Sequence, residues 1–98
     1  MKTMVQYVHD RILTYSFNTA VDFTLGRGND TLFLLDLNKE VYSFDIQEIA
    51  VTSFKDTHKD LLNDHLHLIC DSHANFDQYI DTFDIGIFNL AIYLIAII

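Results

Sequence analysis

The sequence predicts an α/β fold, with one mainly parallel sheet of strand order 3-2-1-4 and helices on both faces. Four short apolar segments with strand character alternate with helical patterns, at residues 19–23, 41–44, 66–70 and 84–90. The chain between the first two strands is long enough for a parallel crossover, which needs a dozen or so residues. Because a doubly wound sheet reverses its winding near its middle, we expect ligands beyond the strand C-termini at that point.

Each helical segment is predicted from its own pattern. Residues 4–16 place apolar side chains at helical spacing, which predicts an opening amphipathic helix. Residues 31–37 are too apolar for a loop and predict a short buried helix. Residues 47–62 predict the second crossover helix, with an acidic side chain in the first turn and lysines later, as the helix dipole favours. Residues 71–74 then predict a loop, and residues 75–80 a further short helix.

Length and composition describe one small acidic domain. The chain has 98 residues, half of them hydrophobic, which suffices for a single domain over residues 1–98. Six basic residues against fourteen acidic ones give a net charge of −8, which opposes non-specific adhesion to nucleic acid. A single cysteine, Cys70, excludes an intramolecular disulfide and agrees with a reducing cytoplasm. Polar residues interrupt the N-terminal segment, so we do not expect a secretory signal.

A glycine turn and a strand-end carboxylate indicate a nucleoside site. Residues 22–31 read DFTLGRGNDT, in which Gly26 and Gly28 follow the first strand and precede a helix. Glycines let the backbone approach a ligand, and a helix N-terminus offers free N–H groups. Asp45 ends the second strand, where its carboxylate would accept both ribose hydroxyls; the alternative is a helix cap. Thr31 stands where a dinucleotide fingerprint carries its third glycine, which argues against an NAD site.

Four motifs in order resemble one family. They are DFTLGRGNDT at residues 22–31, FDIQE at 44–48, DSH at 71–73 and FNL at 88–90. Together they resemble the small class I S-adenosylmethionine (SAM) dependent methyltransferases known as rRNA methylases, some of which methylate 5-aminomethyl-2-thiouridine at the tRNA wobble position. The resemblance implies a Rossmann-like sheet, SAM as the cofactor and an RNA substrate, with tRNA expected and DNA not.

The resemblance also implies roles for single residues. Cofactor-binding residues would follow the first three strands: Asp22, Thr24, Gly26, Gly28, Asp30, Asp45, Gln47, Asp71, Ser72 and His73. Asp22 or Thr24 would contact the amino-acid part of SAM, and Asp71 the adenine amino group, with the two residues after it shaping the pocket wall. Asn89, near the end of the fourth strand, is the catalytic candidate, because in the family this segment faces the methyl-transfer site.

Several of these residues have structural alternatives. Asp30 either contacts the ligand or caps a helix that begins at Thr31. Asp71 either binds adenine or forms an ordinary strand-to-helix turn. Asn89 either faces the reaction or is a buried side chain bonded to a neighbouring element. Arg27 either shields the site or points to solvent, and solvent is our expectation.

Other catalytic chemistries find little support in the sequence. His65 and His67 alternate on a strand with no identifiable third ligand, so we expect a structural role and no metal site. His73 is the exception, because it lies in the DSH motif, where a perturbed imidazole could matter. A nucleophile elbow and a GKS or GKT phosphate loop are both missing, which argues against a hydrolase or an NTPase.

The last segment departs from the family pattern. After FNL the family continues with a Gly-Tyr-Leu-Pro-Gly-like turn and about as much chain again, whereas residues 91–98 read AIYLIAII. We expect a truncated or frame-shifted product, either a methyltransferase or a catalytically incomplete SAM-binding remnant. The apolar run is shorter than the ~20 residues that a membrane-spanning helix needs. We therefore expect no membrane partner, but a buried strand or covered edge, with a homodimer through the fourth strand and this tail.

Overall fold

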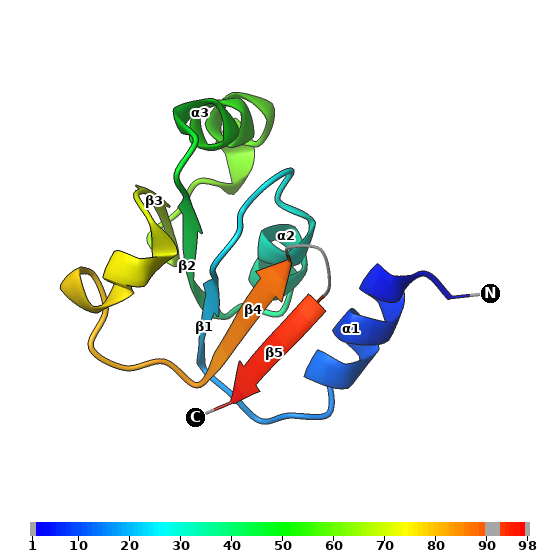
Figure 1. Ribbon diagram of the computed structural model, residues 1–98. Helices are drawn as coiled ribbons and strands as arrows, with labels where there is room; N and C mark the ends of the chain where they lie inside the picture. Colours follow the sequence, from blue (N-terminus) through cyan, green and yellow to red (C-terminus); the bar gives the residue numbers. More distant parts are fainter. Residues whose placement is uncertain (1, 90–92, 98) are drawn as a thin grey trace.

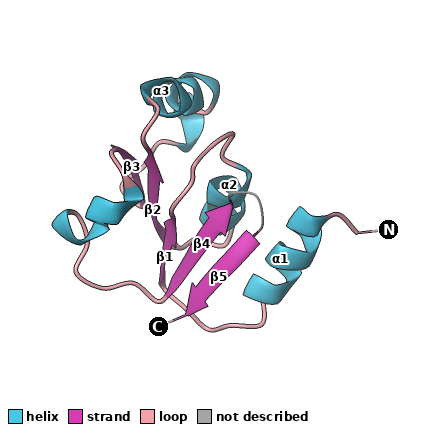
Figure 2. Cartoon of the chain, in the orientation of Figure 1, coloured by secondary structure: helices cyan, strands magenta, loops and turns pink. Residues whose placement is uncertain are grey.

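The computed structural model describes residues 2–89 and 93–97, with side chains through residue 88. Its five strands form one sheet in the order β3-β2-β1-β4-β5 (Figures 1 and 2). The strands are β1 (Thr19–Asp22), β2 (Glu40–Asp45), β3 (Leu66–Cys70), β4 (Ile85–Asn89) and β5 (Tyr93–Ile97). The first four run parallel, which confirms the predicted order 3-2-1-4.

The helices divide between the two faces of the sheet. They are α1 (Met4–Ile12), α2 (Asn29–Asp36) and α3 (Glu48–Thr57), with two 3₁₀ segments, η1 (Lys59–Leu61) and η2 (His73–Gln78). The segment after β3 that contains η2, yellow in Figure 1, lies on the opposite side of the sheet from α1 and α2. Consecutive crossovers therefore reverse direction between β1 and β4, and this reversal places the ligand-binding edge at the C-terminal ends of the strands.

Strand alternation explains why the two faces have separate cores. On β1, Ala20 is buried in the cluster that contains Ile12 of α1 and Leu34 of α2. The next residue, Val21, faces the other way and joins the cluster formed with Phe44 and Ile80. Successive side chains of a strand point to opposite faces, so a sheet covered on both sides needs apolar residues in succession.

The helix boundaries follow from local chemistry. Thr3 and Gln6 form a reciprocal capping box that starts α1, and Val8 and Ile12 bury one face of the helix. The predicted helix over residues 4–16 ends four residues early, at Ile12. The second predicted crossover helix, over residues 47–62, is likewise divided into α3 and the short η1.

The apolar tail adds a strand that reverses direction. Residues 93–97 pair with β4 in antiparallel register, from Ile85 opposite Ile97 to Asn89 opposite Tyr93. A strand was expected here, and its antiparallel direction was not. β4 therefore has a neighbour on each side. Residues 90–92 and 98 of the predicted tail lie outside the described residues. Within the described part of the chain, every helix is too short or too polar to span a membrane.

A carboxylate joins the start of β2 to the outer strand β3. Glu40 lies 3.0 Å from His65 Nδ1 and 2.5 Å from His67 Nε2, and the His67 ring stacks on Tyr42. The hydrogen bonds from His67 and then His65 lower the pKa of Glu40. The two alternating histidines thus have a structural role, as the sequence analysis predicted.

We expect Glu40→Gln to lower the free energy of unfolding by about 0.5 kcal/mol near neutral pH, the scale of an exposed ion pair. Because the pKa of Glu40 is lower in the folded state, its contribution is present above the ordinary glutamate pKa. The contribution is lost as the pH falls through the folded-state pKa. Urea unfolding of wild type and variant across this range measures the difference, with Asp60→Asn as the exposed control. A difference that persists in acid would contradict the assignment.

Candidate functional site

Three parallel strands end at one edge of the sheet with an aspartate each. Asp22 ends β1 and Asp45 ends β2, while Asp71 follows β3 directly. Asp45 borders several hollows here, and two of them adjoin at the strand ends. The first, which we call the loop hollow, is about 350 Å³ and is lined by residues 24–30 and 45–47. The second, the base hollow, is about 220 Å³ and is lined by residues 23–24, 45–46 and 71–73. Thr24, Asp45 and Ile46 border both, so the two hollows form one continuous surface.

The loop hollow owes its shape to two glycines with left-handed backbone angles. Gly26 has φ +52° and Gly28 has φ +87°, and Gly28 is the N-cap of α2. The loop is tied to the sheet by a hydrogen bond from the Leu25 N–H to the Phe44 carbonyl, 2.8 Å long. At Gly28 a Cβ would lie 2.3 Å from the Phe54 ring, whereas at Gly26 it would meet open space. Gly28 is thus required by packing, and Gly26 leaves the backbone open toward the hollow.

Asp45 joins the glycine loop to the second strand. Its Oδ2 accepts a hydrogen bond from the Gly26 N–H at 3.0 Å, and its Oδ1 accepts one from the Gln47 N–H at 2.9 Å. An ionised carboxylate has about four acceptor positions, so each oxygen retains capacity for a further donor. The N-cap of α3 is Gln47, so Asp45 does not occupy the cap position that its alternative role required. Its carboxylate borders both hollows.

Asp71 is held by three donors of the turn that follows it. Its Oδ1 accepts from the Ser72 N–H at 2.7 Å and from Asn75 Nδ2 at 3.0 Å, and its Oδ2 accepts from the Tyr79 hydroxyl at 2.7 Å. The Tyr79 bond first, and then the other two, lower the pKa of Asp71. The carboxylate is therefore a fixed negative charge that organises η2, and it also lines the base hollow.

The wall of the base hollow is largely apolar. Phe23 stacks on Phe88 with ring centroids 4.3 Å apart, and the His73 ring meets both edge-on at 5.9 Å and 5.6 Å. Ile46 also lines this hollow and is 74% exposed although it is a large apolar side chain. A hollow lined by an exposed isoleucine and by aromatic rings suits a flat apolar ligand such as a nucleobase. The Ser72 hydroxyl accepts from the Ala74 N–H and starts η2.

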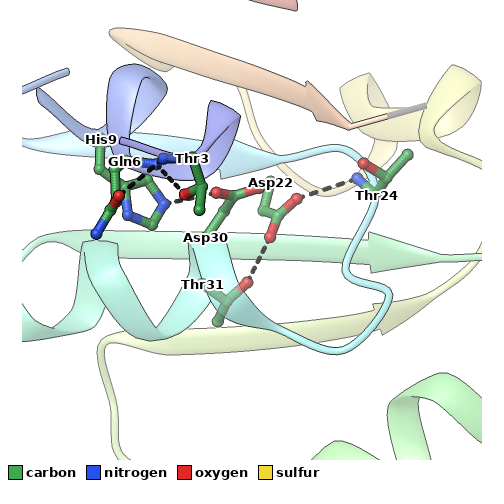
Figure 3. A network of polar contacts seen from close by, with 7 residues as sticks. All are labelled: Thr3, Gln6, His9, Asp22, Thr24, Asp30 and Thr31. Carbon is green, nitrogen blue, oxygen red and sulfur yellow. Dashed lines mark hydrogen bonds and ion pairs between the residues drawn. The ribbon is translucent and has the colours of Figure 1, made fainter. Parts of the chain in front are cut away.

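Asp22 lies beneath the loop, completely buried, and does not line either hollow. Its Oδ2 accepts from the Thr31 hydroxyl at 2.7 Å, and its Oδ1 accepts from the Thr24 N–H at 3.1 Å (Figure 3). Burial raises the pKa of Asp22 to about 7, with a further increase from the Asp30 charge, against the opposing Thr31 hydrogen bond. The structure thus gives Asp22 a supporting position behind Thr24.

Asp30 does not cap the helix that follows the glycine loop, and its carboxylate contacts α1 instead. α2 begins at Asn29 with no side-chain cap, so the predicted capping role of Asp30 is wrong. The carboxylate is 3% exposed and lies 2.7 Å from His9 Nε2 of α1. Figure 3 shows the two side chains pointing toward one another. The His9 ring stacks on Phe33 of α2, at 3.9 Å between centroids. Asp30 therefore joins α1 to the helix that follows the glycine loop, while its residue still borders the loop hollow.

The remaining candidate site residues either lie at the edge of the loop hollow or have side chains outside the described part of the structure. Thr24 and Gln47 border the loop hollow. Arg27 is exposed, in agreement with the expected solvent orientation. Asn89 is the last residue of β4, and its side chain lies outside the described part of the structure. Among the described residues, His, Cys, Asp and Glu form no group of three suited to a metal ion.

The sequence analysis missed residues whose roles depend on the tertiary fold. Ile46 directly follows Asp45, the predicted ribose-binding residue. Its position just after the end of a strand was the one sequence signal that could have indicated a place at the site. His9 lies 21 positions before Asp30, and Ser43 lies 12 positions after Thr31, whose hydroxyl it meets at 2.6 Å. Sequence spacing alone gives no indication of either contact.

Comparisons with known proteins identify relatives for this chain. A family model described as "Putative rRNA methylase" matches residues 41–94, more than half of the chain. The crystal structure of an rRNA methylase from Streptococcus thermophilus is 38% identical, with a TM-score of 0.80 over 92% of this chain. A "putative methyltransferase" from Streptococcus mutans, solved in complex with SAH, is 34% identical, with a TM-score of 0.72 over 82% of this chain. This chain covers 56% and 47% of those two proteins, or about half of each.

The two glycines predict different costs of substitution. We expect Gly26→Ala to lower the free energy of unfolding by about 1 kcal/mol, the cost of a left-handed backbone with a Cβ. Gly28→Ala adds a clash with the buried Phe54 ring, so we expect about 3 kcal/mol in total. Urea unfolding followed by circular dichroism measures both variants. Equal losses at the two positions would show that Phe54 does not constrain the loop.

Proposed function

We propose, since the chain belongs to the rRNA methylase family, that its two hollows bind SAM for the transfer of a methyl group. The observation that carries the proposal is the hydrogen bond between the Gly26 N–H and Asp45 Oδ2. It brings the open glycine loop and a strand-end carboxylate to the same cavity, and both are needed to hold a nucleoside that carries an amino-acid tail. The SAH named in the Streptococcus mutans structure supports the same ligand class.

The residues at the rim fit such a ligand in chemical terms. The loop hollow offers backbone from Gly26 to Gly28 and the start of α2 for the amino-acid end. Asp45, with acceptor capacity to spare on each oxygen, would take the ribose hydroxyls, and Gln47 lies beside it. The base hollow, lined by Ile46, His73 and Phe23 among others, would take adenine.

Methyl transfer asks little covalent chemistry of this chain. SAM supplies an activated methyl group: the acceptor forms a bond to the methyl carbon, and the sulfur keeps the electron pair of the broken C–S bond. The work of the protein is to hold the donor still and to orient the acceptor. The strand ends of β1 to β3 would fix the donor. Asn89 at the end of β4, beside β1, would face the acceptor.

For the acceptor we propose an RNA, with the wobble uridine of tRNA as the leading candidate, in the cytoplasm. The name of the Streptococcus thermophilus relative, an rRNA methylase, supports RNA as the substrate class. A net charge of −8 disfavours a phosphate-binding surface on this chain alone. We therefore propose that a second copy, paired through the β4 and β5 side of the sheet, contributes to the RNA surface.

The proposed ribose contact predicts a loss of affinity in Asp45→Asn. We expect SAM and SAH to bind this variant more weakly by about 1–3 kcal/mol, the scale of charge-assisted hydrogen bonds. Isothermal titration calorimetry measures the affinities, and Glu48→Gln, an exposed neighbour of equal charge, is the control. NAD should bind neither protein. Undiminished SAM affinity in a folded Asp45→Asn protein would contradict the assignment.

The proposed acceptor predicts which RNA receives label. We expect radioactive methyl from SAM to enter unmodified tRNA more readily than rRNA fragments or DNA. Scintillation counting of each purified nucleic acid after incubation measures this. SAM binding without transfer to any RNA would identify a cofactor-binding unit that does not act on RNA, and preferred labelling of rRNA would replace tRNA as the substrate.

A further inference from the structure

A carboxyl group and two hydroxyl groups form a hydrogen-bonded chain under the proposed cofactor site, and the direction of its hydrogen bonds can reverse. Thr31 Oγ1 is 2.7 Å from Asp22 Oδ2 and 2.6 Å from Ser43 Oγ, and the three side chains are all completely buried. When Asp22 is ionised, Thr31 donates to it and accepts from Ser43. When Asp22 carries a proton, it can donate to Thr31, which then donates to Ser43. Asp22 can therefore gain or lose a proton with no movement of heavy atoms.

The charged groups around Asp22 are mostly acidic. Asp30 of α2 and Asp45 of β2 both raise the pKa of Asp22, although burial is the main cause. His9 of α1 faces this group only through Asp30. β4, which pairs with β1 here through Ile87, presents no charged side chain in its sequence. The pKa of Asp22 is about 7, so a ligand that changes the local charge changes its protonation near neutral pH.

Asp22 acts on the proposed site through charge and not through contact. Its carboxyl group does not line either hollow, but the next residues along the chain, Phe23 and Thr24, line the base hollow, and Thr24 also lines the loop hollow. The Thr24 N–H donates to Asp22 Oδ1. A buried charge is screened little by solvent, so a cation in the hollows would stabilise the ionised form of Asp22.

We propose that Asp22 is a specificity-determining residue, whose buried carboxyl group makes this site prefer the cationic sulfonium donor over the neutral thioether left after transfer. The inference rests on the proposed SAM site. When the sulfonium binds, it brings one positive charge, and the protonated Asp22 loses its proton to solvent. The bound site then contains a sulfonium and an ionised carboxylate of opposite charge. When the methyl group leaves, the sulfonium charge disappears and Asp22 takes the proton back. The site then binds the neutral product more weakly, which favours product release.

The first test measures the proton directly in the wild-type protein. Calorimetric titration with SAM, in buffers of different ionisation enthalpy near the pKa of Asp22, should reveal release of a substantial fraction of one proton, and SAH much less. Across that pKa the SAM affinity should rise roughly three- to tenfold with pH, and the SAH affinity less than about twofold. Equal proton release with both ligands would overturn the proposal.

A variant separates Asp22 from the titration of the ligands themselves. Asp22→Asn keeps an oxygen for the Thr24 N–H and an amide that can donate to Thr31, so its shape and bonds suit the buried position. We expect this variant to lose the pH dependence of the ratio between SAM and SAH affinities, while Asp64→Asn, an exposed residue before β3, retains it. Retained dependence in a folded Asp22→Asn protein would overturn the proposal.

The two proposals fail in different ways. If neither SAM nor SAH binds the wild-type protein, the proposed cofactor site is wrong. If both bind and their affinity ratio does not change with pH, the proposed cofactor site is supported and the proposed role of Asp22 is wrong. If Asp22→Asn does not fold, the wild-type proton release still decides between these outcomes.

Discussion

The hydrogen bond between the Gly26 N–H and Asp45 Oδ2 is the contact on which the site depends. It joins the loop after β1 to the end of β2, and a second bond, from Leu25 N–H to the Phe44 carbonyl, runs alongside it. Parallel pairing brings these strand ends to the same edge, but pairing alone would leave the loop free to move over the sheet. The carboxylate fixes the loop and remains partly available at its surface, so one side chain both shapes the cavity and forms part of its lining.

Packing beneath the loop reinforces this arrangement. Gly28 lies against the ring of Phe54 of α3, which is buried in one cluster with Leu25 and Val51. On the same face, the Thr31 hydroxyl bonds to Asp22 and Ser43. The polar groups under the loop are thus satisfied by one another, and the described side chains leave no fully buried nitrogen or oxygen without a partner. A satisfied buried network gives a rigid support, and it also concentrates negative charge under the site.

The sequence predicted the sheet well, because strand order depends on local patterns. Apolar runs marked β1 to β4, and the glycines and Asp45 marked the edge where the two hollows open. The sequence could not predict which carboxylates reach the cavity. Asp22, Asp30 and Asp45 look equivalent along the chain, yet Asp22 is enclosed with Thr31 and lines neither hollow. Asp30 borders the loop hollow while it contacts His9, and Asp45 borders both hollows. These differences come from long-range contacts that have no periodic signal.

The residues of the candidate site are concentrated at the ends of three strands. Those that line the two hollows lie between positions 23 and 73, and their supports include Asp22 of β1 and Tyr79 after η2. Phe88 of β4 supports the wall of the base hollow by stacking on Phe23, which lines it. The two hollows are therefore lined by β1, β2 and β3 with the segments that follow them. An acidic floor suits a cationic donor and repels a phosphate backbone. Under the proposed function, the acceptor would then approach from the β4 side, where Phe88 stacks on Phe23, and not across the strand ends that would hold the donor.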